Sequence, residues 1–153
     1  MPLHALHAVS LKDDTVALAY RFRGTRGEAD EDEFEAALAA ETRALWRRGA
    51  AAEPVAVVVA GRVVCVQDAG AGLVFLLSGD EGEDELAVAQ ALPSLLRVLA
   101  LVCEQEPARL AAQHLVAAHG KVVQCLAEAF PQGVRRSTNA EAVVRAAKLK
   151  ALS

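Results

Sequence analysis

The chain has 153 residues, of which 54% are apolar and 4% aromatic, and its formal net charge at pH 7 is −4. This length is that of one ordinary domain, so we expect residues 1–153 to form a single domain. Nucleic acid is excluded as a partner, because phosphate binding needs a basic field and base stacking needs aromatic rings.

The first third of the chain predicts a hairpin followed by a helix. Residues 3–10 and 15–22 are short apolar segments separated by an Asp-rich gap, which is typical of two paired strands. Between residues 30 and 48, apolar side chains such as Phe34 and Leu38 recur at helical spacing. Acidic residues crowd the start of this segment and arginines its end, as the helix dipole favours.

Three apolar runs then predict a meander of three strands. They cover residues 53–60, 61–68 and 71–79 and are separated by glycine-bearing joints. Their continuous apolar character predicts central strands that are covered on both faces. The second joint, at residues 69–72, resembles a phosphate-binding loop only superficially, because a strand follows it and no Lys-Ser or Lys-Thr pair does.

The remaining segments predict helices. Asp84 is a plausible N-cap for a mostly apolar helix that ends near Cys103, and Pro93 predicts a bend or break inside it. Pro107 begins a further helix to Phe130, with Gly120 as its weak point. A capping box at Thr138 and Glu141 starts a last helix. The element order is therefore ββ-α-βββ-αα with an additional C-terminal helix, an α+β fold with a five-stranded antiparallel sheet.

The candidate catalytic and metal-binding residues do not converge. His114 and His119 are five residues apart, which places them about 140° apart around one helix, and His4 and His7 fall on opposite faces of a strand. The acidic segment 80–85 lacks the ligand order of a calcium loop and is better explained as a solvated turn. We therefore expect no metal and no cofactor.

The cysteines predict packing in a reducing compartment. Cys65, Cys103 and Cys125 are odd in number, lack CxxC spacing and lie in apolar runs, where burial raises the pKa of a thiol. The N-terminal residues lack the pattern of a secretion signal, and the longest apolar run, 55–66, is shorter than the roughly 20 residues of a membrane span. These observations predict a cytosolic chain that is not an enzyme.

Two stretches resemble the small chains of vesicle coats. GLVFLLSGDEGEDELAVAQALPSLLRVL, residues 72–99, resembles without a gap the strand, acidic turn and helix of this family. Glu85-Leu86 stand at the Glu-Leu pair of the family, and Val98-Leu99 at its Val-Leu pair. KVVQCLAEAFPQGVRRSTNAEAVVRA, residues 121–146, is similar to the family's C-terminal motif, where Lys121, Phe130 and Gly133 stand at matching positions.

The resemblance is to the sigma subunits of clathrin adaptor complexes, the zeta subunit of coatomer and the small chain of the TSET or TPLATE complex. It implies a longin-type domain that serves as a non-enzymatic subunit of a heterotetrameric complex. It also implies large solenoid and medium subunits as partners, and a cytoplasmic location, peripheral on Golgi, endosomal or plasma membrane through the complex.

The same resemblance places a dileucine-signal pocket at Ala71, Leu73 and Leu96. The arginine that accompanies this pocket falls on Ala17 or Val16, so the acidic part of such a signal lacks its cation and the pocket is expected to be vestigial.

The helix after Asp84 carries the candidate partner surface. Its apolar residues cover more of the circumference than one sheet face can bury, so part of them is expected to face a partner: Leu86, Leu92, Leu95 and Leu99. Alternatively, the next helix covers this excess. Two other functions stay open: a longin-type tethering or GTPase-regulating subunit, and a small-molecule-binding domain or enzyme with a preformed pocket.

Overall fold

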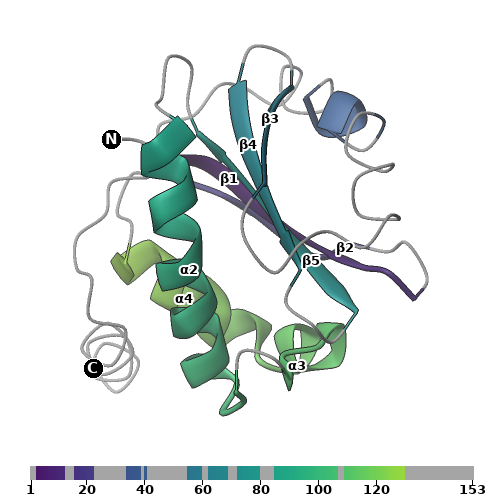
Figure 1. The fold of residues 1–153 in the computed structure, drawn as a ribbon. Coiled ribbons are helices and arrows are strands. Elements are labelled where there is room, and N and C mark those ends of the chain that lie inside the picture. Colours follow the sequence, from purple (N-terminus) through teal and green to yellow (C-terminus); the bar gives the residue numbers. More distant parts are fainter. Residues whose placement is uncertain are drawn as a thin grey trace.

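A computed structural model describes residues 3–12, 16–22, 34–38, 40, 55–59, 62–68, 72–79, 85–106 and 109–129. These residues form a five-stranded sheet with the strand order β2-β1-β5-β4-β3, in which all pairings are antiparallel. Figure 1 shows the sheet with helices packed against it, so the predicted α+β fold is confirmed. The elements are β1 Leu3–Ser10, β2 Val16–Arg21, β3 Val55–Val59, β4 Arg62–Asp68, β5 Leu73–Gly79, α2 Glu85–Val102, α3 Ala112–Ala117 and α4 His119–Ala129, and residues 34–38 are helical.

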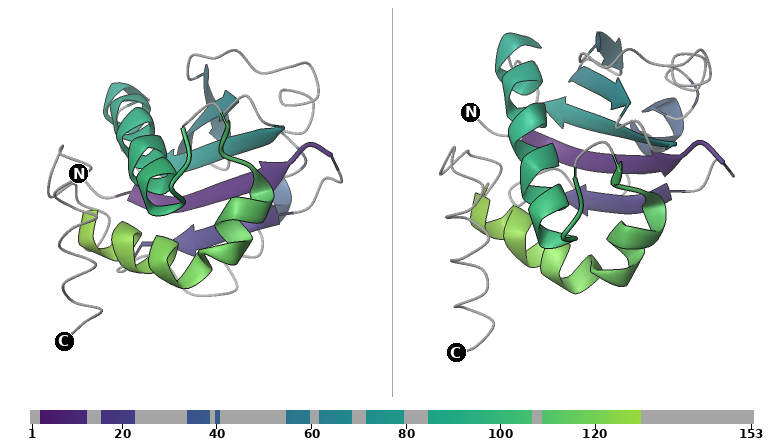
Figure 2. Two further views of the ribbon diagram at one scale, coloured as in Figure 1. Left: turned by 90° about the horizontal axis from the view of Figure 1, so that it is seen from below. Right: turned by 60° about the horizontal axis from the view of Figure 1, so that its bottom comes forward.

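Helices cover both faces of the sheet (Figure 2). We call the face under α2, α3 and α4 the inner face, and the face under the helical segment 34–38 the outer face. Side chains of β5 alternate between the two: Leu73, Phe75 and Leu77 join the inner cluster, whereas Val74 and Leu76 join the outer one. The central strands are therefore buried on both sides, which explains their continuous apolar sequence.

The predicted hairpins are present. In the β3–β4 pair, Val59 lies opposite Arg62, which leaves a two-residue connection. Gly72, at the start of β5, has a φ of 75°, a left-handed conformation that glycine adopts without steric cost. One expectation is wrong: β3 is not central but lies at the edge of the sheet, where Val55 and Val58 are exposed. The central strands include β1 instead, which is buried along its whole length.

β1 contains a bulge that sequence periodicity does not show. Opposite β5, Leu3 pairs with Gly79 and Ala5 with Ser78, so one extra residue, His4, is accommodated on β1. The Ser78 hydroxyl donates a hydrogen bond of 3.1 Å to the carbonyl of Ala5 at this point. Because of this extra residue, the side chains of β1 before and after the bulge do not follow one simple alternation between the two faces of the sheet.

α2 is continuous from Glu85 to Val102, so of the bend or break predicted at Pro93 the break is wrong. Pro93 lies on the exposed side of the helix, where water can satisfy the carbonyl that loses its amide partner. The opposite side is buried, and that burial outweighs a proline cost of about 3 kcal/mol. Beyond the helix, Glu104 has a φ of 55° and the Gln105 amide donates to the Ala100 carbonyl, which is the bond pattern of a Schellman C-cap.

The segment after α2 forms two helices where one was predicted. Ala118, with φ −106° and ψ 21°, separates α3 from α4, and Gly120, the predicted weak point, lies inside α4. Pro107, the expected start, lies outside the described residues, and so does the predicted C-terminal helix. The break turns α4 so that its buried residues Val122 and Leu126 pack with α2 in the inner cluster.

α2 is, among the described helices, the one long and apolar enough to cross a membrane by length and composition. Half of it is buried inside the protein, against β4, β5 and α4. A helix that packs against the core of a protein is buried in this way, and this burial accounts for the apolar composition of α2.

Candidate functional site

The histidines of the second half have separate structural environments. His114 belongs to α3 and His119 to α4, so they do not share one helix as the sequence analysis assumed. The Ala111 amide donates a hydrogen bond of 3.0 Å to Nδ1 of His114, which satisfies an amide at the start of α3. Within the described part of the chain, no three His, Cys, Asp or Glu side chains are grouped as a metal site would need.

Cys65 and Cys103 are packing residues. Cys65 is buried in the inner cluster, and burial, assisted by the negative charge of Glu85, raises the pKa of its thiol to about 11. Burial also raises the pKa of Cys103, whose Sγ donates to the His114 carbonyl at 3.6 Å. A thiol with a raised pKa is a poor nucleophile at neutral pH, as the sequence analysis expected.

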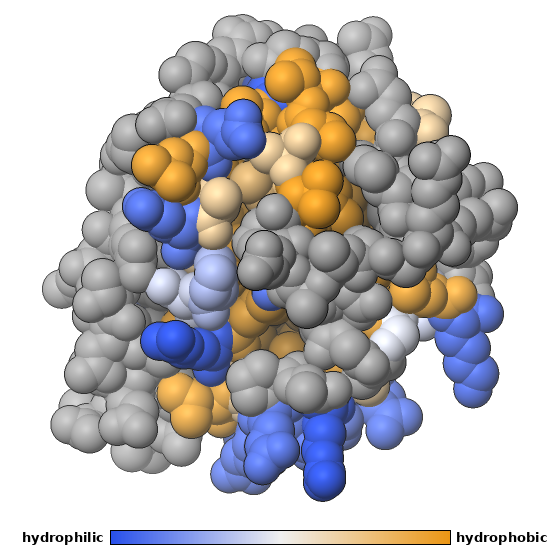
Figure 3. Space-filling view, in the orientation of Figure 1, coloured by the Kyte–Doolittle hydropathy of each residue, from blue (hydrophilic) through white to orange (hydrophobic). Residues whose placement is uncertain are grey.

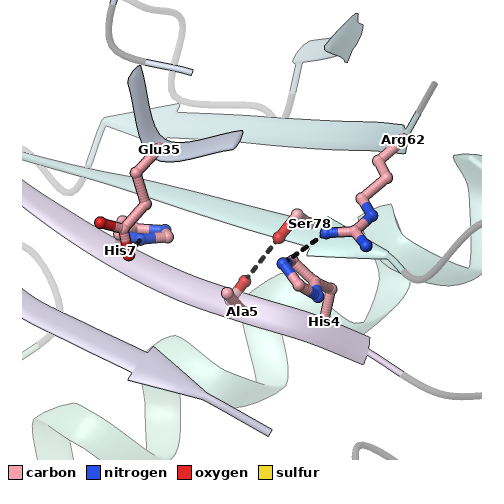
Figure 4. Close-up of polar contacts among 6 residues, drawn as sticks. All are labelled: His4, Ala5, His7, Glu35, Arg62 and Ser78. Carbon is pink, nitrogen blue, oxygen red and sulfur yellow. Dashed lines mark hydrogen bonds and ion pairs between the residues drawn. The ribbon is translucent and has the colours of Figure 1, made fainter. Parts of the chain in front are cut away.

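His4 and His7 lie on the same face of β1 (Figure 4), so the expectation that they occupy opposite faces is wrong. In a regular strand, residues three apart lie on opposite faces. The bulge at His4 adds one residue to β1 and interrupts this alternation, so both side chains are turned to the outer face. There they meet the helical segment 34–38: His4 makes an edge-on contact with the Phe34 ring at 5.1 Å, and His7 Nε2 lies 3.5 Å from Oε1 of Glu35.

Arg62 completes this outer cluster. It comes from β4, is buried, and its Nη1 donates a hydrogen bond to Nε2 of His4. Its Cζ also lies 5.0 Å from the centroid of Phe34, in cation–π geometry. Sequence reasoning missed the cluster, although an arginine inside the valine-rich run 62–66 was a signal that a polar group is buried there.

Burial lowers the pKa of His7 below its ordinary value. The positive charge of Arg21 acts in the same direction, whereas the hydrogen bond and the charge of Glu35 raise the pKa and oppose burial. The buried outer cluster thus favours a neutral His7, held against a partly exposed carboxylate.

The predicted partner-facing leucines of α2 divide into two sets. Leu92, Leu95 and Leu99 are fully buried in the inner cluster, which also contains residues of the sheet and of α4. Leu86 is 62% exposed and Leu101 is 41% exposed. Of the four leucines expected to face a partner, Leu86 is therefore exposed and the other three are buried.

Of the dileucine-pocket positions, the two that belong to the described residues lie beneath the surface. Leu73 is fully buried and Leu96 nearly so, both within the inner cluster, and Ala71 lies outside the described residues. Ala17 packs against the same cluster, whereas Val16 is exposed at the edge strand β2.

Apolar side chains are also exposed beside α2. Figure 3 shows apolar surface over β3 and β4 next to this helix, where Val58 is 67% exposed on the edge strand. The exposed large apolar residues among the described ones are Val16, Val55, Val58, Leu86, Leu101 and Val116. Exposed apolar side chains on neighbouring elements are typical of surfaces that bind another protein.

No family model and no curated protein sequence matches the chain. Chains of known structure do match, among them a chain of a homology model of the full-length AP-3 complex in a stretched open conformation. The two chains are 15% identical, the match covers 98% of this chain and 94% of that chain, and the TM-score is 0.65. The chain has the longin-like fold of an adaptor-complex subunit. At this identity the likeness is one of fold.

Proposed function

We propose that the chain is a small, non-enzymatic structural subunit of a heterotetrameric adaptor or vesicle-coat complex, sigma-like or zeta-like, which binds a large solenoid subunit. The observation that carries this proposal is the match in fold over nearly the whole of both chains. The coat-like motifs around Glu85-Leu86 and Val98-Leu99 support it independently, because they are features of the sequence.

The roles of the reactive residues support a structural function. Cys65 packs under α2, His114 starts α3, and His4 and His7 hold the outer layer. In each case a side chain that could carry chemistry is used in packing or in a hydrogen bond within the fold.

The proposed partner surface is the exposed side of α2 together with the neighbouring edge strand β3. Leu86 and Leu101 lie on α2, Val58 lies on β3, and the two elements are in contact. A partner that covers these side chains removes apolar surface from water, at about 25 cal/mol per Å². We propose that the pocket at Ala71, Leu73 and Leu96 is vestigial, so that scaffolding and not cargo recognition is the function of the chain.

In this proposal the partners are the large and medium subunits of the complex, through which the chain is held at the cytoplasmic surface of Golgi, endosomal or plasma membranes. The test is affinity purification of the tagged chain at low salt, followed by identification of stoichiometric partners by mass spectrometry. Recovery of a large helical-solenoid chain with a medium chain supports the proposal. Recovery of small tethering subunits, or of this chain alone, contradicts it.

A further inference from the structure

The two edge strands of the sheet, β2 and β3, differ in charge and cover (Figure 1). An edge strand presents backbone N–H and C=O groups that can pair with another chain, and proteins commonly protect such an edge with charged side chains or a covering element. β2 ends at the exposed Arg21, and α3 is in contact with it. β3 has no charged residue between Val55 and Val59.

The sequence of β3 favours pairing with a further strand. It reads Val-Ala-Val-Val-Val, without proline, and β-branched side chains are those that strands prefer. Within the described part of the chain, its backbone pairs with β4 and with no other element. Val55 is 38% exposed and Val58 is 67% exposed. The edge is therefore uncharged and open at two valines.

The alternation of β3 assigns its side chains to the two faces of the sheet. Ala56 packs against the inner cluster, whereas Val57 and Val59 belong to the outer cluster. Since successive side chains of a strand point to opposite faces, Val58 shares the inner face with Ala56, and Val55 shares the outer face with Val57.

This arrangement is complementary to itself. When two copies of β3 run antiparallel with Val57 opposite Val57, Ala56 of each copy lies opposite Val58 of the other on the inner face. Val55 lies opposite Val59 on the outer face. A small side chain thus meets a larger one at the most exposed position, and no charge faces a like charge.

We propose that β3 is a self-association edge, through which two copies of the chain pair antiparallel and join their sheets into one. The occupant is a second copy because β3 matches itself in side-chain size and carries no charge that would repel its equivalent. The same contact made from both sides gives a closed, two-fold dimer. The proposed function assigns β3 to the surface for a large subunit, so the dimer is a state of the chain without that subunit and does not depend on the proposed function.

The test is the mass of the purified full chain, measured by sedimentation as the concentration rises from about 1 µM to about 100 µM. One strand pair is a small interface and is expected to bind weakly, so the mass should rise from one copy to two within this range. A mass of one copy throughout, or growth beyond two copies, overturns the proposal.

Hydrogen exchange at the two concentrations locates the contact. Amide exchange in β3 is expected to be about tenfold slower in the dimer, while exchange in β2 does not change. A dimer without added protection in β3 overturns the proposal. Protection of β3 that requires a different protein also overturns it, because the occupant is then not a second copy.

Two matched variants compare the edges. Val58→Lys places a charge on β3 and is expected to raise the dissociation constant of the dimer at least about tenfold. Val16→Lys makes the same change on β2, at a position that is 58% exposed, and should leave the constant unchanged. An equal effect of the two variants overturns the proposal.

If Val58→Lys does not fold, crosslinking decides. Val57→Cys places a thiol next to its equivalent in the proposed register, so a short bismaleimide should link two copies of this variant. The control Val16→Cys should link no more than the unaltered chain. Equal yields from the two cysteine variants overturn the proposal.

Discussion

The two faces of one sheet are packed in different ways. The inner face is a cluster of leucine, phenylalanine and small side chains under α2, α3 and α4, in which Leu92, Leu95 and Leu99 are fully buried. The outer face is mostly valine, and its cover, the segment 34–38, is fixed by His4, His7 and Arg62 as well as by apolar contact. An apolar cluster is insensitive to pH, whereas buried imidazoles are not.

This difference separates two roles. The inner face provides the stability of the fold, since apolar burial is its main favourable term. Among the described residues, the outer face combines apolar contacts with polar and ring contacts of His4, His7 and Arg62. The four predictions below test this division, from the largest expected effect to the smallest.

Leu95→Ala tests whether the α2 leucines are core residues or partner contacts. Removal of a fully buried leucine is expected to lower the free energy of unfolding of the isolated chain by about 3 kcal/mol, measured by urea titration. The control Leu101→Ala, on an exposed position of the same helix, should cost less than about 1 kcal/mol. Equal costs would show that Leu95 is not part of the inner core.

The thiol of Cys65 reports on closure of the inner face. Its pKa is raised from 9.0 to about 11, which lowers the thiolate fraction at neutral pH, and so the rate of alkylation, about 100-fold. Alkylation by iodoacetamide, followed by mass spectrometry, should be this slow in the native chain and fast in denaturant. Native alkylation at the rate of a free cysteine would mean that the inner face opens readily.

Leu86→Glu tests the exposed side of the inner layer as the partner surface. Binding of the large subunit is expected to weaken about tenfold, because a charge replaces an apolar contact at the interface. Val116→Glu is the matched control: Val116 is also 62% exposed but lies on α3, outside the proposed surface. Affinities measured with the purified partner should separate the two variants, and an equal loss in both would remove α2 from the interface.

Phe34→Leu tests the outer layer. The substitution keeps most of the apolar volume but removes the ring that His4 and Arg62 contact, at a cost of about 1 kcal/mol, or about fivefold faster exchange of 34–38. Exchange of α2 should not change. The corresponding inner-face variant, Phe75→Leu, should instead accelerate exchange in α2, and an identical exchange pattern in the two variants would mean that the faces are not separable.

The sequence predicted most of the architecture because hydrophobic periodicity and turn residues are local. The strands predicted at 3–10, 61–68 and 71–79 begin and end within a few residues of these bounds. Gly61 correctly indicated the short connection between Val59 and Arg62. What failed depends on tertiary contacts. Burial of one side of α2 overcomes the propensity of Pro93 to interrupt a helix, and packing of α4 against α2 decides where the third helix breaks.

The outer cluster was beyond prediction for a geometric reason. Period-two alternation assigns His4 and His7 to opposite faces, and one bulge residue reverses this assignment for His4. The contact between His4 and Arg62 also joins residues 58 positions apart, which no local pattern specifies. For α2, composition showed that the helix is unusually apolar, but only its packing in the fold shows which leucines remain exposed.

The measurement that tests the central claim most directly is the native mass of the complex purified through this chain. A single assembly that contains one copy of this chain with two large subunits and one medium subunit is the result the proposal predicts. A mass equal to this chain alone, or to an assembly with small subunits of its own size, would contradict its assignment as a coat or adaptor subunit.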